Sequence, residues 1–455
     1  MASVYLTRKR KKRLEQGHPW IFQNEVEKTE GEIIPGGIVS VFNHQAQFIA
    51  TGYINPQSQI VVRIVDYSPL EAMTIDFFIA RFRKCLEHRQ RFLEQGESYR
   101  LVYGDADFLP GLVVDKFADV LVVQIVTLGM DRCREQIVVA LIEVLQPTGI
   151  YERSDVSVRE LEGLEQTTGV LFGQCPQFVT MVENGLQIEV DIHAGQKTGY
   201  FFDQRENRAA IQPLMLGWGK RSGIEWKEVK RDNGDMQKVP VNSNGKEVTF
   251  PYWDGAMVLE CFSHSGSFTL NACKYGAKKV TCLDISERAI DSARRNVALN
   301  GFEDRVEFVV ADAFDYLREQ VKGSDQRKER AEAGQTKVDT SIPLVSQSRK
   351  WDVVILDPPA FAKSKAAIEG AYRGYKDINL HAMKLVNEGG YLVTASCSYH
   401  VHPELFLHTI LEAALDAGKI LRLIEFRGAG KDHPQILGVE EGHYLKFAIF
   451  EVRSR

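Results

Sequence analysis

Residues 256–272, AMVLECFSHSGSFTLNA, are the stretch that decides the fold. The apolar run at 257–261 predicts a strand, and the small residues around Gly266 predict a tight loop at 262–267. A helix is expected at 268–274. A strand, a tight loop and a helix form the first unit of a doubly wound α/β domain. In such a domain a ligand binds beyond the carboxyl ends of the strands, although one glycine by itself is a weak signal.

Polar or reactive residues follow each of four further predicted strands. These strands, at 279–283, 306–310, 351–356 and 390–395, are followed in turn by Asp284, Asp312, Asp357-Pro358-Pro359 and Ser396-Cys397-Ser398. Ser286 is expected to cap a helix that stops at Asn300-Gly301. Because folding alone does not require such residues at every strand end, we predict that this edge of the sheet binds a ligand.

The composition sets broad limits on the class of protein. The chain has 455 residues, a length that suggests roughly three domains, and 44% of them are hydrophobic, which is enough for packed cores. The net charge of −5 argues against a chain that is basic throughout. The seven cysteines include no Cys-x-x-Cys pair, so neither a zinc site nor a disulfide framework is indicated. No apolar run approaches the ~18 residues of a membrane helix, so we expect a cytoplasmic protein without a membrane partner.

A basic cluster of six consecutive residues lies near the start of the chain. It consists of Arg8, Lys9, Arg10, Lys11, Lys12 and Arg13, and Gly17-His18-Pro19-Trp20 follows it. Short strands expected at 36–42, 47–53 and 60–65 predict a small β-barrel domain over residues 1–70. RNA phosphates pair with Lys and Arg and RNA bases stack on aromatic rings, so the basic cluster and Trp20 are candidate RNA contacts. A solvated strand end or a disordered arm explains the cluster equally well.

Residues 71–190 are predicted to form an α+β domain. Helices are expected at 74–94 and 131–144, and strands at 100–103, 112–115 and 120–125 lie between them. The charged turn Tyr151-Glu152-Arg153-Ser154-Asp155 in this domain is as readily a structural feature as a substrate contact.

The third predicted domain covers residues 191–455. It opens on 193–208, HAGQKTGYFFDQRENR, where Asp203 can cap a helix that starts near Gln204. Loops of this composition between domains often contact ligands. Two polar insertions, at 217–255 and 322–350, are expected to be solvated loops. A helix at 402–417 and strands at 421–427 and 444–452, expected as an antiparallel pair, complete the domain.

Three cofactor classes compete for this domain. Nicotinamide binding usually shows Gly-x-Gly-x-x-Gly and triphosphate binding shows Gly-x-x-x-x-Gly-Lys-[Ser/Thr], and the sequence contains neither. S-adenosylmethionine binding tolerates a looser glycine loop. It uses an acid after the second strand for the ribose and one after the third for the adenine amine, the places of Asp284 and Asp312. The candidate cofactor residues are Gln196, Tyr200, Asp203, Gln204, Phe262, Ser263, Gly266, Asp284, Ile285, Asp312, Ala313 and Asp357.

The type of methyl transfer depends on Cys397, which follows the last of the predicted parallel strands. Carbon 5 of cytosine becomes nucleophilic only after a thiolate adds to carbon 6, and a base then removes the proton from carbon 5. The other cysteines are expected in helices, in strands or outside this domain. A cysteine at a strand end is often buried and inert. The neighbouring Asp357-Pro358-Pro359 reverses that interpretation, because a prolyl pair predicts a rigid loop that can hold a planar base.

Six short motifs are spread over nearly the whole chain outside the two insertions. They are Gly17-His18-Pro19-Trp20, Leu109-Pro110-Gly111-Leu112, Gly195-Gln196-Lys197-Thr198-Gly199-Tyr200-Phe201, Asp203-Gln204-Arg205, Asp357-Pro358-Pro359-Ala360-Phe361 and Ser396-Cys397-Ser398. A chain with these motifs resembles the bacterial 23S ribosomal RNA cytosine-5 methyltransferases of the RlmI type. The resemblance implies an N-terminal PUA domain, a central α+β domain and a Rossmann-like methyltransferase domain. It also implies S-adenosylmethionine as methyl donor, 23S ribosomal RNA as substrate and often a homodimer.

This group lacks the second cysteine that other RNA cytosine-5 enzymes carry after the prolyl pair. Ala360 occupies that position here, as in the RlmI type, so another group must act as the base. We assign Cys397 as the nucleophile and Asp357 as the base. Arg205 and Lys363 join the candidate RNA contacts.

Three other functions remain as alternatives. Methylation of guanine nitrogen 7 needs no thiol, so Cys397 argues against it. Methylation of an exocyclic amine suits an Asp-Pro-Pro-aromatic loop, but Ala360 separates the aromatic residue from the prolines. A non-catalytic RNA-binding ribosome assembly factor would not need intact acids at Asp284, Asp312 and Asp357.

Overall fold

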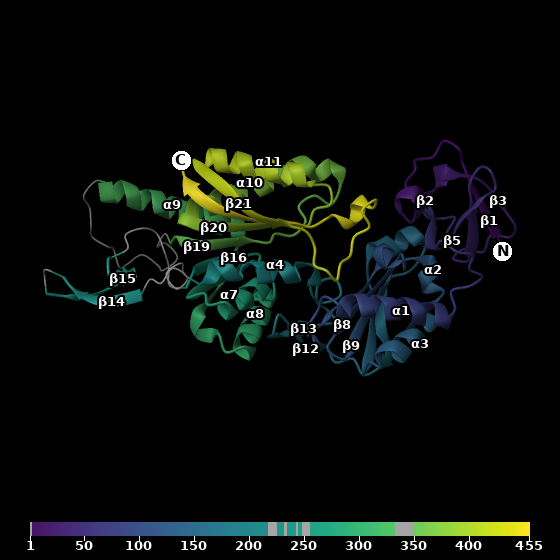
Figure 1. The fold of residues 1–455 in the computed structure, drawn as a ribbon, viewed down its shortest axis with the longest axis horizontal. Helices are drawn as coiled ribbons and strands as arrows, with labels where there is room; N and C mark the ends of the chain where they lie inside the picture. The colour runs from purple at the N-terminus through teal and green to yellow at the C-terminus, as the bar shows by residue number, and fades with distance from the viewer. Residues whose placement is uncertain (1, 217–224, 232–233, 243, 248–254, 333–348) are drawn as a thin grey trace. The chain divides into compact units, whose positions relative to one another are not determined.

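The computed structural model describes residues 2–216, 225–231, 234–242, 244–247, 255–332 and 349–455, and only the backbone of 324–332. The chain forms two compact units (Figure 1). The first unit comprises Met1–Arg205 and Ala429–His443. The second comprises Glu206–Gly428 and Tyr444–Arg455. The segment 429–443, which we predicted to belong to the third domain, is thus part of the first unit.

A six-stranded sheet begins the first unit. Its strands are β1 (Ala2–Leu6), β2 (Trp20–Phe22), β3 (Val26–Glu30), β4 (Ile38–Phe42), β5 (Phe48–Ile54) and β6 (Ile60–Asp66). They lie in the order β2-β6-β5-β4-β1-β3. In β1 and β4 buried and half-buried residues alternate, because neighbouring side chains of a strand point to opposite faces. Val4, Leu6 and Val41 therefore face the core of this sheet, which confirms the predicted small β domain.

A five-stranded sheet with two main helices forms the rest of the first unit. The sheet has the order β11-β10-β9-β8-β7 and is accompanied by a separate hairpin, β12-β13. These elements are β7 (Tyr99–Tyr103), β8 (Leu112–Phe117), β9 (Val120–Ile125), β10 (Gly149–Ser154), β11 (Thr167–Gly173), β12 (Phe178–Glu183), β13 (Leu186–Asp191), α1 (Ile75–Gln90) and α3 (Arg134–Leu145). Helix α1 begins where the Thr74 hydroxyl accepts the Phe77 N–H, and it ends before the predicted position 94.

Buried ion pairs hold the first unit together. Arg100 in β7 donates two hydrogen bonds of 2.8 Å to Asp115 in β8, whose carboxylate is fully buried and also accepts the Thr198 hydroxyl. Asp432, from the segment 429–443, accepts the Arg100 N–H at 3.1 Å. The segment 429–443 is therefore bound to the first unit through Asp432, a residue that the sequence patterns did not identify.

The second unit is a seven-stranded sheet with helices on both faces (Figure 1). Its strands, in spatial order, are β18 (Val306–Val310), β17 (Lys279–Asp284), β16 (Met257–Cys261), β19 (Trp351–Leu356), β20 (Val386–Ser396), β22 (Lys446–Ser454) and β21 (Lys419–Arg427). The five strands from β18 to β20 run parallel, and β22 pairs antiparallel with both β20 and β21. The winding direction reverses between β16 and β19, which is where doubly wound sheets bind their ligands.

Within the described residues, the longer helices of the second unit pack on this sheet. They are α7 (Ser267–Lys274), α8 (Glu287–Leu299), α9 (Ala313–Glu332), α10 (Ile368–Leu385) and α11 (Pro403–Asp416). Helices α9, α10 and α11 lie together on one face, and α7 and α8 lie on the other (Figure 1). Trp351, Tyr375 and Phe406 are fully buried in the core under the first group. Helix α8 begins at the predicted cap, since the Ser286 hydroxyl accepts the Ala289 N–H.

The two polar insertions are more regular than we predicted. Strands β14 (Glu225–Lys230) and β15 (Met236–Val241) form an antiparallel hairpin inside the first insertion. Helix α9 continues to Glu332, so the first eleven residues of the segment 322–350, which we expected to be a loop, are helical. The hairpin buries Val239 and Val241 in addition to its backbone hydrogen bonds, and α9 extends by its own backbone hydrogen bonds. Residues 217–224, 248–254 and 333–348 of the insertions lie outside the described residues. Among the described residues, no helix has the length and apolar character to cross a membrane.

The buried Arg100–Asp115 pair generates a stability prediction. Asp115→Ala leaves the Arg100 guanidinium buried without its carboxylate, so we expect the first unit to lose about 3–5 kcal/mol of unfolding free energy. Urea denaturation, with hydrogen exchange of β7 and β8 as a local readout, measures this loss. The control is Glu30→Ala, which removes the exposed pair with Lys28 and should leave the urea midpoint unchanged. Equal midpoints for the two variants would contradict the prediction.

Candidate active site

The carboxyl ends of five parallel strands meet at one edge of the second-unit sheet. The register pairs Cys261 at the end of β16 with Leu283 in β17 and Leu356 in β19. Leu356 in turn pairs with Thr394 in β20. The predicted site residues that follow these strands are thereby gathered at this edge. They are Phe262, Ser263, Gly266, Asp284, Ile285, Asp312, Ala313, Asp357 and Cys397.

The loop after β16 has an unusual backbone. Phe262, His264 and Gly266 have φ angles of 64°, 49° and 77°, in the left-handed region that non-glycine residues rarely adopt. At Gly266 a Cβ atom would lie 3.0 Å from the Ala293 Cβ of α8, so glycine also allows the loop to pack on that helix. The Ser263 N–H donates to the Leu283 carbonyl at 3.0 Å. The loop is therefore held in one shape beside β17.

Asp284 at the end of β17 organises this loop. Its Oδ2 accepts the His264 N–H and its Oδ1 accepts the Ser286 N–H, both at 2.9 Å. A carboxylate has about four acceptor positions, so these bonds leave capacity for ligand hydroxyls. The next side chain, Ile285, is 67% exposed although it is large and apolar. An acid beside an exposed apolar side chain fits a ribose hydroxyl pair and the flat base attached to it.

Asp312 is placed in a similar way after β18. Its Oδ1 accepts the N–H groups of Phe314 and Asp315 at 2.8 and 3.1 Å, which caps the first turn of α9. Within the described parts of the chain, its Oδ2 has no hydrogen-bond partner. Ala313, which follows it, is buried. The arrangement leaves one carboxylate oxygen to accept from an amino group such as that of adenine.

Glu260 is a functional candidate that our sequence reasoning missed. Its Oε2 accepts both the N–H and the hydroxyl of Thr269 in α7, and the side chain is buried. Burial and, to a smaller extent, the nearby charges of Asp357 and Asp284 raise the pKa of Glu260 to about 8, although the hydrogen bonds from Thr269 oppose the shift. An acid inside the otherwise apolar strand was the signal that could have revealed it.

The two predicted catalytic residues lie on adjacent loops. Asp357 follows β19, and its N–H donates to the Cys261 carbonyl at 3.5 Å. The Cys397 thiol, after β20, points to the Pro358 carbonyl, with an Sγ–O distance of 3.9 Å. Ser398 accepts the Ala362 N–H at 3.1 Å and thereby ties the two loops together. The Asp-Pro-Pro loop and the cysteine are thus neighbours, as their strand order predicted.

Cys397 differs from the other cysteines of this unit. It is half-buried, whereas Cys261, Cys273 and Cys282 are buried. Burial raises the pKa of each of these three thiols, which keeps them in the protonated, unreactive form. Accessibility therefore singles out Cys397 as the candidate nucleophile of the second unit.

Four predicted cofactor residues belong to the first unit. Gln196 is exposed, while the buried Tyr200 hydroxyl donates to Glu183 at 3.1 Å. Asp203 and Gln204 are buried within the 3-10 turn Phe202–Gln204, and α4 (Arg205–Ala210) follows. Asp203 therefore lies inside the turn, which corrects its predicted position as the cap before Gln204. The role of these four residues toward a cofactor remains a prediction.

The predicted RNA contacts divide into paired and exposed side chains. Arg10 pairs with Glu15 at 2.6 Å, and Arg13 pairs with Glu25 at 3.3 Å. The Trp20 indole N–H donates to Asp105 at 3.1 Å. The exposed candidates are Arg8, Lys9, Lys11, Lys12 and, in the second unit, Lys363.

Arg205 requires a correction. Its guanidinium is buried, pairs with Glu97 at 2.7 Å and also donates to the Ser98 carbonyl. A guanidinium that already has buried carboxylate and carbonyl partners has no surface from which to reach an RNA phosphate. The aspartate and aromatic residues around it in sequence made it resemble a ligand loop, and only the tertiary structure shows its structural role.

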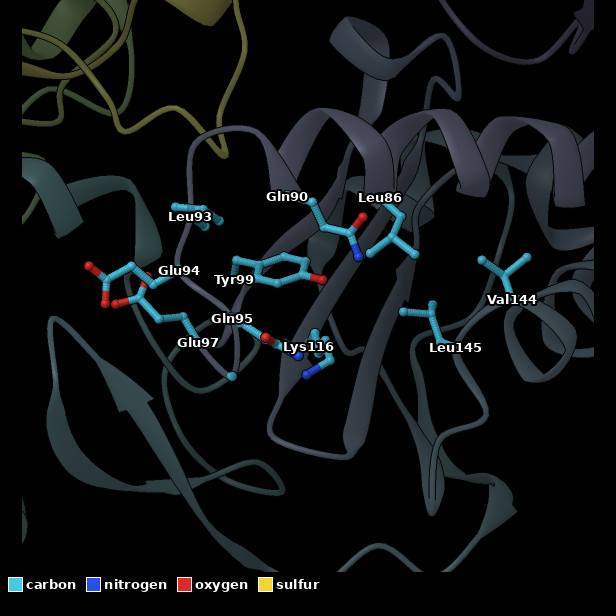
Figure 2. Close-up of a pocket in the computed structure, with 11 residues that line it drawn as sticks. Leu86, Gln90, Leu93, Glu94, Gln95, Glu97, Tyr99, Lys116, Val144 and Leu145 are labelled. Atoms are coloured by element: carbon cyan, nitrogen blue, oxygen red, sulfur yellow. The ribbon is translucent and has the colours of Figure 1, made fainter.

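A pocket of about 450 Å³ lies in the first unit. Figure 2 shows Leu86 and Gln90 of α1, Tyr99 and Lys116 of the sheet, and Leu145 at the end of α3 around it. None of the catalytic candidates lines it, so we do not assign the active site to it.

The sheet order, the acids after β17 and β18 and the cysteine after β20 together define a class. This class is a Rossmann-like S-adenosylmethionine-dependent methyltransferase, here combined with a PUA-like domain. Family models agree, since a "PUA-like domain" matches residues 4–67 and a "Methyltransferase domain" matches residues 254–428. Curated relatives carry the assignment further: the chain belongs to the family of ribosomal RNA large subunit methyltransferase I.

The relatives match over nearly their whole length. The chain is 37% identical to the Ribosomal RNA large subunit methyltransferase I of Pseudoalteromonas translucida, over 99% of both chains. It is 36% identical to that of Aeromonas hydrophila, over 99% of this chain and 100% of the other. These matches confirm the resemblance inferred from the six motifs.

Solved structures share the fold at lower identity. A protein of Streptococcus mutans, described as a SAM-dependent methyltransferase, aligns with a TM-score of 0.70 at 19% identity, over 99% of this chain and 100% of that one. A methyltransferase complexed with SAH aligns with a TM-score of 0.72, also at 19% identity and with the same coverage. Both matches support the observed arrangement of the elements.

The raised pKa of Glu260 generates a pH prediction. Between its ordinary pKa of 4.5 and about 8, the folded state keeps a proton on Glu260 that the unfolded chain releases. The unfolding free energy should therefore fall as the pH rises through this window, by up to ~1.4 kcal/mol per pH unit from this group. Glu260→Gln cannot titrate, so its stability should fall less steeply between pH 5 and 8. Urea unfolding at several pH values measures both slopes, and equal slopes would refute the assignment.

Proposed function

We propose that the protein methylates carbon 5 of a cytosine in 23S ribosomal RNA through a covalent adduct with Cys397. The observation that carries this proposal is the half-buried Cys397 thiol next to the Asp357-Pro358-Pro359 loop, with 3.9 Å between Sγ and the Pro358 carbonyl. The names of the curated relatives support ribosomal RNA of the large subunit as the substrate. The homodimer implied by the resemblance stays a prediction.

S-adenosylmethionine, when bound, supplies an electrophilic methyl group. Asp284 is proposed to accept the ribose hydroxyls, and Asp312 to accept the adenine amino group through Oδ2. The exposed Ile285 side chain would cover one face of the adenine. The loop at Phe262–Gly266, with its left-handed backbone at Phe262, His264 and Gly266, is proposed to present its backbone to the cofactor at the same edge.

The Cys397 thiolate is proposed to act on the cytosine. It adds to carbon 6, forming an S–C6 bond and moving the ring electrons to carbon 5, which then takes the methyl group as the bond between that methyl and the donor's sulfur breaks. A base removes the proton from carbon 5, the C5–C6 double bond re-forms, and the S–C6 bond breaks to return the thiolate. The overall reaction requires one base and no oxidant or reductant.

Asp357 is the proposed base. It stands one residue before the Pro358 carbonyl that Cys397 contacts, so it belongs to the same loop as the cytosine clamp. Ala360 cannot provide a second thiol, which leaves the carboxylate as the proton acceptor of this loop. The prolyl pair fixes the loop backbone and keeps carbonyl oxygens available for the cytosine amino group.

The aromatic residue of the same loop argues against methylation of an exocyclic amine. Phe361 packs on Tyr375 and Phe314, with ring-centroid distances of 4.6 and 5.8 Å. It is therefore part of the packing under α10 and is engaged away from a substrate base. Guanine nitrogen 7 would need no thiol, so the accessible Cys397 also favours cytosine over guanine.

RNA affinity is proposed to come from the exposed part of the basic cluster. Arg8, Lys9, Lys11 and Lys12 are exposed, while Arg10 and Arg13 have internal carboxylate partners. Lys363, exposed in the loop that begins with Asp357, is the proposed contact near the reacting base. Trp20, half-buried with its N–H bonded to Asp105, is the proposed aromatic contact for an RNA base.

Substitution of the nucleophile tests the proposed chemistry. Cys397→Ala should abolish methylation while S-adenosylmethionine and RNA binding persist, because neither binding step uses the thiol. RNA with 5-fluorocytosine at the target should form a stable adduct with the wild type, since fluorine cannot leave as a proton does. Nucleoside analysis of the product and gel detection of the adduct are the measurements.

The matched control is Cys175→Ala, which alters a half-buried cysteine of the first unit. This variant should methylate RNA and form the adduct like the wild type. Methylation by Cys397→Ala would overturn the thiol mechanism and favour methylation of a nitrogen.

Neutralising the exposed basic residues tests RNA binding. The combined change of Arg8, Lys9, Lys11 and Lys12 to Gln should weaken RNA binding. It should also make the slope of log binding constant against log salt concentration less steep, by roughly 0.7–0.9 for each lost phosphate contact. Fluorescence anisotropy at several salt concentrations gives the slope. The control changes four exposed lysines on the β14–β15 hairpin and its flank, Lys227, Lys230, Lys238 and Lys246. An unchanged slope in the first variant would show that the basic cluster does not touch phosphate.

A further inference from the structure

A buried lysine lies next to the proposed nucleophile. Lys446 is the first residue of β22 and pairs in register with Ser396, the last residue of β20. Its side chain is 1% exposed. The ammonium Nζ donates to the carbonyl oxygens of Ser398 and Tyr444, both at 2.7 Å. The charge is therefore fixed one residue from Cys397.

The burial of this cation is unusual. An isolated ammonium is costly to remove from water, and buried lysines normally pair with a carboxylate. Across the described parts of the chain, no carboxylate lies within ion-pair distance of Lys446 Nζ. Two carbonyl oxygens satisfy two of its three N–H donors but do not neutralise its charge. The fold alone gives no reason for a charge at this position.

The Cys397 thiol, in turn, needs a nearby positive charge to become a thiolate. The Pro358 carbonyl can accept a hydrogen bond from Cys397 Sγ, which favours the neutral thiol. A nucleophile must be a thiolate, and an ordinary cysteine thiol has a pKa near ~8.5. A neighbouring cation is one of the features that lower such a pKa.

The pKa of Lys446 is consistent with this pairing. Burial lowers the pKa of Lys446 to about 8, and the charge of the Cys397 thiolate opposes that lowering. The interaction is mutual, so the ammonium stabilises the thiolate by the same amount. Lysine and cysteine thus favour each other's charged form near neutral pH.

The other ionisable groups around Cys397 come from three elements. Tyr375 in α10 reaches Ser398 with its hydroxyl at 3.0 Å, and burial raises the pKa of Tyr375, so it is neutral. Asp357, in the loop after β19, carries a charge that disfavours a thiolate. His400, in the loop of Cys397 itself, packs on Tyr399 with 5.0 Å between ring centroids. Lys446 is therefore the one buried cation that the described residues bring to this loop.

We propose that Lys446 is a positioning residue that holds the Ser396-Cys397-Ser398 loop in place and stabilises the Cys397 thiolate. The inference rests on the proposed function, because it assumes that Cys397 is the nucleophile. The lysine stays protonated throughout: the thiol proton leaves to water before the S–C6 bond forms. When that bond breaks, the thiolate returns to the same cation.

The thiol titration tests this role directly in the protein without RNA. The rate of Cys397 alkylation by iodoacetamide, measured by mass spectrometry of its peptide across pH 5–10, reports the thiolate fraction. In Lys446→Met the profile should move to higher pH, and the rate at pH 7 should fall about tenfold for each unit of pKa increase. Lys446→Arg should keep most of the wild-type rate, because it retains the charge.

Two controls separate electrostatics from a structural effect. The half-buried Cys175 in the same samples should be alkylated equally in all variants. His400→Gln should leave the Cys397 profile unchanged. A profile in Lys446→Met that equals the wild type overturns the proposal. If Lys446→Met does not fold, the wild-type profile decides: a Cys397 pKa at or above ~8.5 overturns the proposal as well.

Methylation kinetics distinguish this inference from the proposed function. Lys446→Met should lower kcat at pH 7 with KM for RNA unchanged, and higher pH should restore part of kcat. Methylation that survives in Cys397→Ala defeats the proposed function whatever the alkylation result. An unshifted alkylation profile defeats the role of Lys446 while leaving the thiol mechanism intact.

Discussion

The parallel register of β16, β17, β19 and β20 is the constraint on which the site depends. Because the strands run in the same direction and in step, each one must end at the same edge of the sheet. The loops that follow have no strand partner, so they are free to carry polar groups. The reversal of winding between β16 and β19 separates the loops there and leaves room for a ligand. The parallel register thereby brings together candidate residues from Phe262 to Cys397 that are far apart in the sequence.

Electrostatics at this edge follows from the same geometry. Asp284, Asp312 and Asp357 all follow strands that end at this edge of the sheet. Each charged carboxylate there raises the free-energy cost of ionising another carboxyl group nearby. Glu260 responds by holding its proton to about pH 8, which removes one negative charge from the cluster. On the opposite side, Lys446 contributes a buried positive charge near Cys397. The edge thus combines carboxylates suited to hydroxyl and amino groups with a thiol that has both the Asp357 loop and the Lys446 ammonium nearby.

The first unit uses buried charges for a different purpose. Arg100–Asp115 and Arg205–Glu97 are enclosed ion pairs that fix strands, a turn and the segment 429–443 in place. Removal of one partner would leave the other charged and buried, so such pairs are sensitive to substitution. The basic cluster shows the contrast: its members with carboxylate partners are structural, and its exposed members remain available to a polyanion.

Much of the second unit could be predicted because its parallel strands are short apolar runs, largely buried in β16 and β19 and less so in the edge strand β18. The strands 257–261, 306–310 and 351–356, and the Ser286 cap, depend on neighbouring residues only, so local pattern determined them. The motifs likewise indicated the family. Tertiary structure alone decided the rest: the burial of Arg205, the return of 429–443 to the first unit, and the place of Lys446 opposite Ser396. These depend on pairings between residues far apart in the chain, which composition and periodicity do not encode.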